Sequence, residues 1–181
     1  MDINNFFSYH EEEDIPLYNT KILFSKLYNY SPQKFYNFLN LFTKDNTLDF
    51  SPNIKFSNSS ESILNLYQPS FKVIFATKLN NMFALPLLNN YLSSFNKEDY
   101  KILATLGPLK INHSILDEFK NIIKNYNKEN DINIIHLDLT YSIIIKDLFK
   151  IIGKEEPFYD IINEYKDFCI SKNLINDIYS Q

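Results

Sequence analysis

Arginine and tryptophan are missing from this chain of 181 residues, which has only two glycines and one cysteine. Because every basic residue is a lysine, the planar guanidinium that commonly contacts phosphate and guanine in a bidentate manner is not available. The 18 lysines face 22 acidic residues, a formal net charge of -4. These features argue against a nucleic-acid partner. The many Asn, Ile and Lys residues also indicate an AT-rich coding sequence, and we give this explanation of the missing arginine the larger weight.

The scarcity of glycine excludes the common nucleotide-binding loops. With only Gly107 and Gly153 present, neither a Walker A loop nor a Gly-x-Gly-x-x-Gly fingerprint can be formed. Gly-x-Ser-x-Gly, His-Glu-x-x-His and Cys-x-x-Cys are also missing, so the familiar hydrolase, zincin and redox classes have no support. We therefore predict no cofactor and no metal site.

The single cysteine bears on the compartment. Cys169 has no partner for an intramolecular disulfide, which fits a reducing environment and predicts the cytoplasm or an organelle interior. The first residues lack the basic and apolar regions of a secretory signal. The longest apolar runs, such as Ile143 to Ile145, are far shorter than the roughly 20 residues that a membrane helix needs. We therefore predict a soluble protein outside the membrane.

The second part of the chain alternates between strand and helix patterns. Three short apolar runs recur about thirty residues apart, the length of a βαβ unit, and a helical pattern follows each of them. These runs are residues 71–77, 100–106 and 132–139. The pattern predicts an α/β fold with a small, mostly parallel sheet of three or more strands that is covered by helices on both faces.

The first part of the chain is less regular, and we predict one domain over residues 1–181. In it, residues 1–70 form an arm and a helix, and residues 71–181 form the repeated strand-helix units. Residues 2–20 have no sustained period, which predicts an irregular segment. Residues 43–60 are rich in Asp, Asn, Ser and Pro, which predicts a loop with a short extended piece around Ile54 to Phe56. Lys21 to Phe24 fits either a short strand or the approach to a helix.

Several helices have recognisable ends or stripes. Ser31 can cap a helix that begins at Pro32 and carries a stripe of large apolar residues. Ser114 with Asp117 approximates a capping box for a helix whose apolar stripe includes Ile115, and Gly153 predicts the end of the helix that follows the third strand. Residues 79–95 predict a helix that Pro86 interrupts, and a last helix begins near Pro157, with Cys169 on its inner face.

The carboxyl ends of the three strands are where ligands bind in an open parallel sheet. Lys78 and Thr105 lie at the ends of the first two runs, and Asp138 lies near the end of the third. Turn-forming polar residues end the strands of any such sheet, so this pattern alone favours a structural role. If the side chains carry chemistry, we expect Lys78 to hold an anionic group.

The third run has polar residues at alternating positions. Because side chains alternate along a strand, His136, Asp138 and Thr140 share one face. Three interpretations stay open: an edge strand whose second face meets solvent, a buried histidine bonded to a neighbour, or an acid/base or metal-binding pair. We rank them in that order, because no Cys, His or Glu stands at a spacing that would complete a metal site.

Two hypotheses of different classes follow. The first is a non-enzymatic intracellular binding or regulatory domain, such as an adaptor, an inhibitor or immunity-type protein, or a subunit of a complex, whose partner is another protein. It rests on the acidic balance, the missing catalytic motifs and an aromatic content of 16% that can supply interface anchors. It predicts an exposed apolar patch, for which the Tyr- and Phe-rich segment before residue 50 is a candidate.

The second hypothesis is a small α/β hydrolase or transferase with its substrate at the carboxyl ends of the strands. Its candidate catalytic residues are His136, Asp138, Lys78 and Thr105. In this interpretation His136 moves a proton, Asp138 orients a partner and Lys78 binds an anion.

Overall fold

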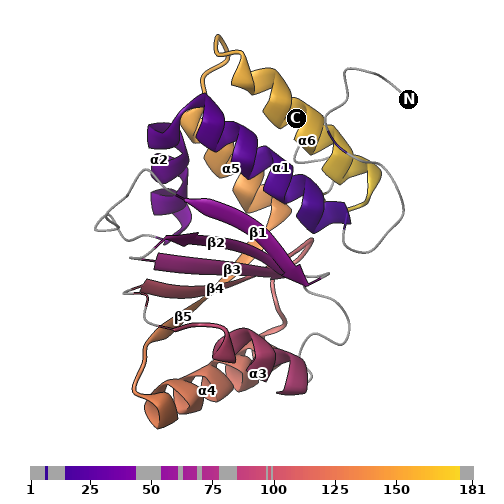
Figure 1. Ribbon diagram of the computed structural model, residues 1–181. Helices are drawn as coiled ribbons and strands as arrows, with labels where there is room; N and C mark the ends of the chain where they lie inside the picture. The colour runs from indigo at the N-terminus through magenta and orange to yellow at the C-terminus, as the bar shows by residue number, and fades with distance from the viewer. Residues whose placement is uncertain are drawn as a thin grey trace. The chain divides into compact units, whose positions relative to one another are not determined.

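The structure is a computed structural model that describes residues 7, 15–43, 54–60, 63–68, 71–77, 85–96, 98 and 100–175. It confirms the predicted α/β class with parallel strands and a helical N-terminal part (Figure 1). The elements in chain order are α1 (Ile15–Tyr30), α2 (Pro32–Thr43), β1 (Lys55–Ser60), β2 (Ile63–Gln68), β3 (Phe71–Thr77), α3 (Leu85–Ser93), β4 (Tyr100–Gly107), α4 (His113–Asn130), β5 (Ile134–Thr140), α5 (Tyr141–Ile151) and α6 (Phe158–Ser171).

Contacts between residues group the chain into two compact units. One unit consists of Met1–Pro52 with Thr140–Gln181, and the other is Asn53–Leu139. The first is helical in its described part, and the second contains the sheet with α3 and α4. A single domain over residues 1–181 stays a prediction.

The sheet has five strands in the order β1-β2-β3-β4-β5. The first three strands pair antiparallel, whereas β3 and β4 pair in parallel, with Phe71 opposite Tyr100 and Thr77 opposite Leu106. Strand β5 follows as the third parallel strand. The three parallel strands are the three apolar runs of the sequence, with bounds that differ by at most two residues.

One face of the parallel strands is covered by α3 and α4. The alternate residues Ile74, Ala76, Leu103 and Ile134 form a buried cluster with side chains of the two helices. The members contributed by the helices are Leu88, Tyr91 and Leu92 of α3 and Phe119 and Ile123 of α4. Because strand side chains alternate, every second residue of β4 and β5 points to this same face.

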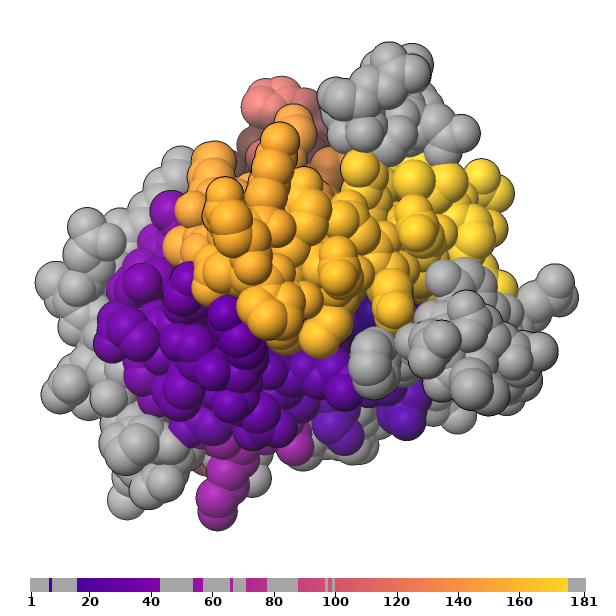
Figure 2. Space-filling model, turned by 90° about the horizontal axis from the view of Figure 1, so that it is seen from above, coloured from indigo at the N-terminus to yellow at the C-terminus, as the bar shows by residue number. Residues whose placement is uncertain are grey.

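In the helical unit, α1 contacts α2 and α6, and α5 contacts α2 and α6. Figure 2 shows the C-terminal helix in yellow beside the N-terminal helices in indigo. Phe35, Phe38, Leu39 and Phe42, the predicted stripe of α2, are all buried. Phe24 of α1 packs on this stripe, with its ring centroid 5.3 Å from that of Phe38. Among the described residues, no helix is both long and apolar enough to span a bilayer.

For the first seventy residues, one expectation was wrong and another was only partly right. Helix α1 begins at Ile15, within the segment predicted to be an irregular lead-in, and it includes Lys21 to Phe24. Its apolar and polar residues are only weakly separated onto two faces, so its sequence gives little indication of a helix. In the segment 43–60, predicted to be a loop with a short extended piece, strand β1 begins near that piece but continues to Ser60, and it pairs antiparallel with β2, for which no prediction was made. The Ser and Asn residues of β1 are typical of loops, and its pairing with β2, which in turn pairs with β3, overrides that preference.

Helix boundaries also differ in detail from the predictions. The N-cap of α4 is Asn112, whose side chain accepts a hydrogen bond from Ser114 N at 3.1 Å, so the capping residue is not Ser114. Helix α5 ends at Ile151 with Ile152 as its C-cap, which places Gly153 directly after the cap as predicted. Gly153 does not adopt a positive φ, so the helix ends without the left-handed residue that such a glycine often supplies.

Candidate functional site

A small polar cluster interrupts the apolar face of the sheet under α4. Thr105 of β4 lies on the same face as Leu103, and His136 and Asp138 of β5 lie on the same face as Ile134. The structure therefore brings three of the four predicted side chains together. The fourth, Lys78, lies outside the described residues.

The hydroxyl of Thr105 connects the histidine and the carboxylate. Thr105 Oγ1 donates to Asp138 Oδ1 at 2.9 Å and lies 2.9 Å from His136 Nε2. A hydroxyl has one proton, and an ionised carboxylate can only accept. The proton of Thr105 therefore points to Asp138, and His136 Nε2 must be the donor to the hydroxyl. This fixes the tautomer of a neutral His136 as the one protonated at Nε2.

The second carboxylate oxygen holds the loop that joins β4 to α4. Ile111 N donates to Asp138 Oδ2 at 2.7 Å. Asn112 then caps α4 one residue later, so the chain on the C-terminal side of this bond is fixed as well. Asp138 is thus bonded both to the strand below it and to the main chain of the loop, which we call the β4–α4 loop (residues 108–112).

The three residues of the cluster differ in how far they are buried. Thr105 is 0% exposed, whereas His136 and Asp138 are half-buried. The imidazole of His136 packs against the Phe119 ring of α4, with ring centroids 4.6 Å apart. Strand β5 lies at the edge of the sheet, as in the first of the three interpretations, and His136 is bonded to a neighbour, as in the second, but it is half-buried and not buried. Among the described residues, no three His, Cys, Asp or Glu side chains are grouped as metal ligands.

The β4–α4 loop presents apolar side chains to the solvent. Leu109 is 78% exposed, the largest fraction for any bulky apolar side chain in the described part of the chain, and Pro108 and Lys110 beside it are exposed too. Ile115, predicted to lie on the buried stripe of α4, is 39% exposed, because it lies in the first turn beyond the edge of the core. Sequence reasoning missed Leu109, since a single leucine between Pro108 and Lys110 has no periodicity.

The aromatic segment before residue 50 does not supply the predicted patch as a whole. Its phenylalanines in the described range are buried in the helical unit, and its exposed aromatic side chains are Tyr18 and Tyr30. Cys169 is buried, as predicted, and burial raises the pKa of its thiol. A raised pKa keeps the thiol protonated at neutral pH, which does not suit a nucleophile.

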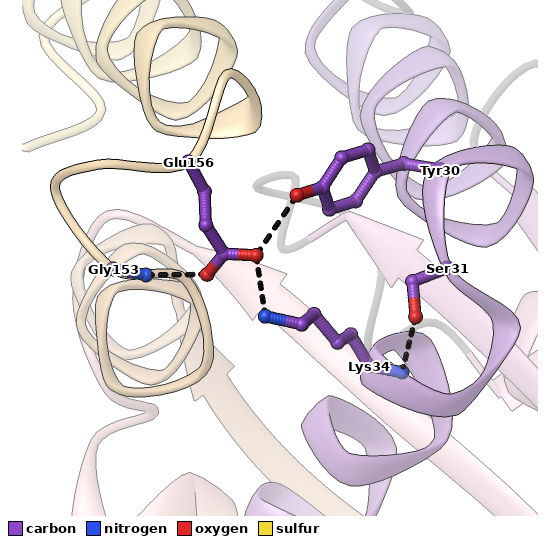
Figure 3. Close-up of polar contacts among 5 residues, drawn as sticks. All are labelled: Tyr30, Ser31, Lys34, Gly153 and Glu156. Atoms are coloured by element: carbon purple, nitrogen blue, oxygen red, sulfur yellow. Dashed lines mark hydrogen bonds and ion pairs between the residues drawn. The ribbon is translucent and has the colours of Figure 1, made fainter.

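A second polar cluster lies in the helical unit, around Glu156. Its carboxylate accepts hydrogen bonds from Tyr30 Oη at 2.8 Å and Gly153 N at 2.7 Å, and it forms an ion pair with Lys34 Nζ (Figure 3). Ser31 Oγ accepts from Lys34 N at 3.2 Å in the turn between α1 and α2. The cluster thus ties the α1–α2 turn to the α5–α6 turn, across more than 120 residues of sequence that no local pattern connects.

These contacts give the stability of the protein a dependence on pH. The bonds from Lys34, Gly153 and Tyr30 lower the pKa of Glu156 to about 2. A lowered pKa contributes stability above the ordinary carboxyl range, and this contribution decreases as the pH falls from about 4.5 towards 2. We expect Glu156→Gln to be less stable than the wild type at neutral pH, with a difference that narrows over this range. Chemical unfolding at several pH values measures it.

The matched control is Glu155→Gln, which makes the same charge change at the exposed neighbouring residue. We expect its stability difference from the wild type to be smaller and to vary less over the same pH range. A constant difference between Glu156→Gln and the wild type from neutral pH to pH 2 contradicts the assignment of these bonds to the ionised carboxylate.

No known protein family, curated protein sequence or solved structure matches this chain. The candidate functional features of the described residues are therefore the two polar clusters and the exposed loop. Of these, only the β4–α4 loop combines a fixed backbone with a strongly exposed apolar side chain.

Proposed function

We propose that this protein is a non-enzymatic binding or regulatory domain that acts inside the cell by contacting another protein through its β4–α4 loop. An adaptor, an inhibitor or immunity-type protein, and a subunit of a complex all fit this description. The observation that carries the proposal is the 78% exposure of Leu109 on a loop that Asp138 holds by its main chain.

The energetics favour such a loop as a contact. Burying an exposed leucine side chain fully is worth about 1.5 to 3 kcal/mol, and the adjacent, exposed Pro108 can add apolar area. The end of the loop is held at Ile111 and Asn112, and a held segment loses less conformational entropy when it binds. In this proposal, Thr105, His136 and Asp138 are positioning residues that keep Leu109 at the surface.

The enzymatic alternative is a small hydrolase or transferase that uses the same cluster. The hydrogen-bonded row of His136, Thr105 and Asp138 is the observation in its favour. Two features weigh against it. Thr105 is 0% exposed, and its proton points to the carboxylate, whereas a nucleophilic hydroxyl needs His136 as its proton acceptor. We therefore favour the binding domain.

Native mass spectrometry of the protein isolated from its own host tests the proposal. We expect a stoichiometric protein partner on the wild type and at least about a tenfold loss of the complex for Leu109→Ser, equal to about 1.4 kcal/mol. Leu41→Ser is the matched control, because Leu41 is also exposed but lies in α2 of the helical unit. It should keep the partner.

Two results would contradict the proposal. A bare chain that carries a metal ion or a small metabolite would instead support the enzymatic alternative around His136 and Asp138. A partner that both leucine variants retain equally would show that the contact lies elsewhere on the chain.

A further inference from the structure

The beginning of β5 is bonded to a side-chain amide of α4. Asn127 Nδ2 donates to Ile134 O at 3.0 Å, and Ile134 N donates to Asn127 Oδ1 at 2.9 Å. An amide side chain has the same donor and acceptor as a peptide group. The two bonds therefore reproduce the exchange of hydrogen bonds in an antiparallel strand pair, with Asn127 in the place of a strand residue.

Strand β5 is the last strand in the order of the sheet, so one side of it is an edge. The N–H of Ile134 has one proton and uses it for Asn127, so this residue faces the edge and not β4. An edge strand is a template for pairing with another chain, and this one is rich in residues that favour strands. Ile135 on it is 41% exposed.

We propose that Asn127 blocks the edge of the sheet. Its side-chain amide forms hydrogen bonds with the main-chain N–H and C=O of Ile134, and these bonds oppose pairing of β5 with β5 of a second copy of this chain. The strand that would pair with this edge is β5 of a second copy, because two identical edge strands can pair antiparallel about a twofold axis. A pair that includes the beginning of β5 needs the exchange of bonds that Asn127 already makes at Ile134. The proposal does not depend on the β4–α4 loop.

The main chain of Asn127 makes hydrogen bonds that do not involve its side chain, so a substitution can test the side-chain bonds separately. Asn127 O accepts hydrogen bonds from Asp131 N and from Ile132 N, the latter at 3.1 Å, and Asp131 has a φ of 53°. These bonds end α4 and do not involve the amide. A substitution at residue 127 therefore removes the bonds to β5 and leaves the main-chain bonds of the helix end available.

The test compares Asn127→Leu with Asn125→Leu by sedimentation velocity over a range of concentrations. Leucine has a similar volume and no hydrogen-bonding group, and Asn125 is exposed on the same helix. We expect Asn127→Leu to associate into dimers with a dissociation constant at least about tenfold lower than that of the wild type or of Asn125→Leu. Adding Ile135→Lys to Asn127→Leu should reverse this association, because a charge on an edge strand opposes pairing.

The proposal is overturned if folded Asn127→Leu associates no more than Asn125→Leu, or if Ile135→Lys leaves its association unchanged. Circular dichroism establishes whether the variant is folded. If it is not, hydrogen exchange of the wild type decides. The Ile134 amide should be protected from exchange at concentrations where the chain is monomeric. Rapid exchange of this amide at those concentrations would exclude the proposed role of Asn127.

Discussion

Replacing Asp138 by alanine is expected to lower the free energy of unfolding by about 2 to 3 kcal/mol, because a charged acceptor of two hydrogen bonds is lost. Thr105 keeps His136 as a neighbour, but the main-chain N–H of Ile111 loses its acceptor. The β4–α4 loop should therefore become mobile. Urea unfolding measures the stability, and hydrogen exchange at Ile111 measures the release of the loop.

Asp117→Ala is the control for this variant, because Asp117 is an exposed carboxylate of α4 with a similar charge. We expect it to change stability by less than about 0.5 kcal/mol. If Asp138→Ala kept the stability of the wild type and the protection of Ile111, Asp138 would not position the loop. Loss of function in such a variant would favour the enzymatic alternative, in which Asp138 orients a partner in proton transfer.

Replacing Phe24 by alanine is expected to cost about 3 to 5 kcal/mol, the largest effect that we predict for a single residue. Phe24 is 0% exposed, and its ring lies 5.9 Å from that of Phe35 and 5.3 Å from that of Phe38. Alanine would leave a cavity between α1 and α2 that these rings can fill only in part. Thermal or urea unfolding measures the loss.

Tyr18→Ala on the same helix controls for the loss of an aromatic residue, since Tyr18 is 47% exposed. It should change the free energy of unfolding by less than about 0.5 kcal/mol. Equal and small effects of the two substitutions would mean that α1 does not pack on α2 through Phe24.

The sheet could be predicted largely from the sequence because its parallel strands are nearly continuous apolar runs. Ile102 to Leu106 and Val73 to Thr77 are buried on both faces, and this pattern needs no knowledge of the tertiary structure. The hairpin β1–β2 could not be predicted in this way. Its strands contain Ser and Asn, and they form because β2 pairs with the edge of β3 and β1 pairs with β2.

Part of the polar cluster could also be predicted from the sequence. Alternation places His136 and Asp138 on one face, and the position of Thr105 near the end of its strand makes it a candidate. The register between β4 and β5 is what sets the Thr105 hydroxyl between the two side chains, and local sequence does not encode this register. The bond from Ile111 to Asp138 joins residues 27 positions apart and depends on the same register.

Exposure was the feature that sequence could predict least. Ile115 fits the apolar stripe of α4 by spacing, yet it lies beyond the edge of the core. Leu109 stands alone between polar and turn-forming residues, so only the folded chain reveals that it is a surface residue on a fixed loop. The contacts of Glu156 to Tyr30 and Lys34 likewise depend on helices that are distant in sequence.

Site-specific photo-crosslinking in the host shows whether the β4–α4 loop contacts a partner protein. A photoreactive amino acid at residue 109 should form an adduct with one partner protein, whereas the same amino acid at Asn121, an exposed residue of α4, should not. This result would place the β4–α4 loop in a protein interface. Equal labelling from both positions, or no adduct from residue 109, would contradict the account of this loop as the binding surface.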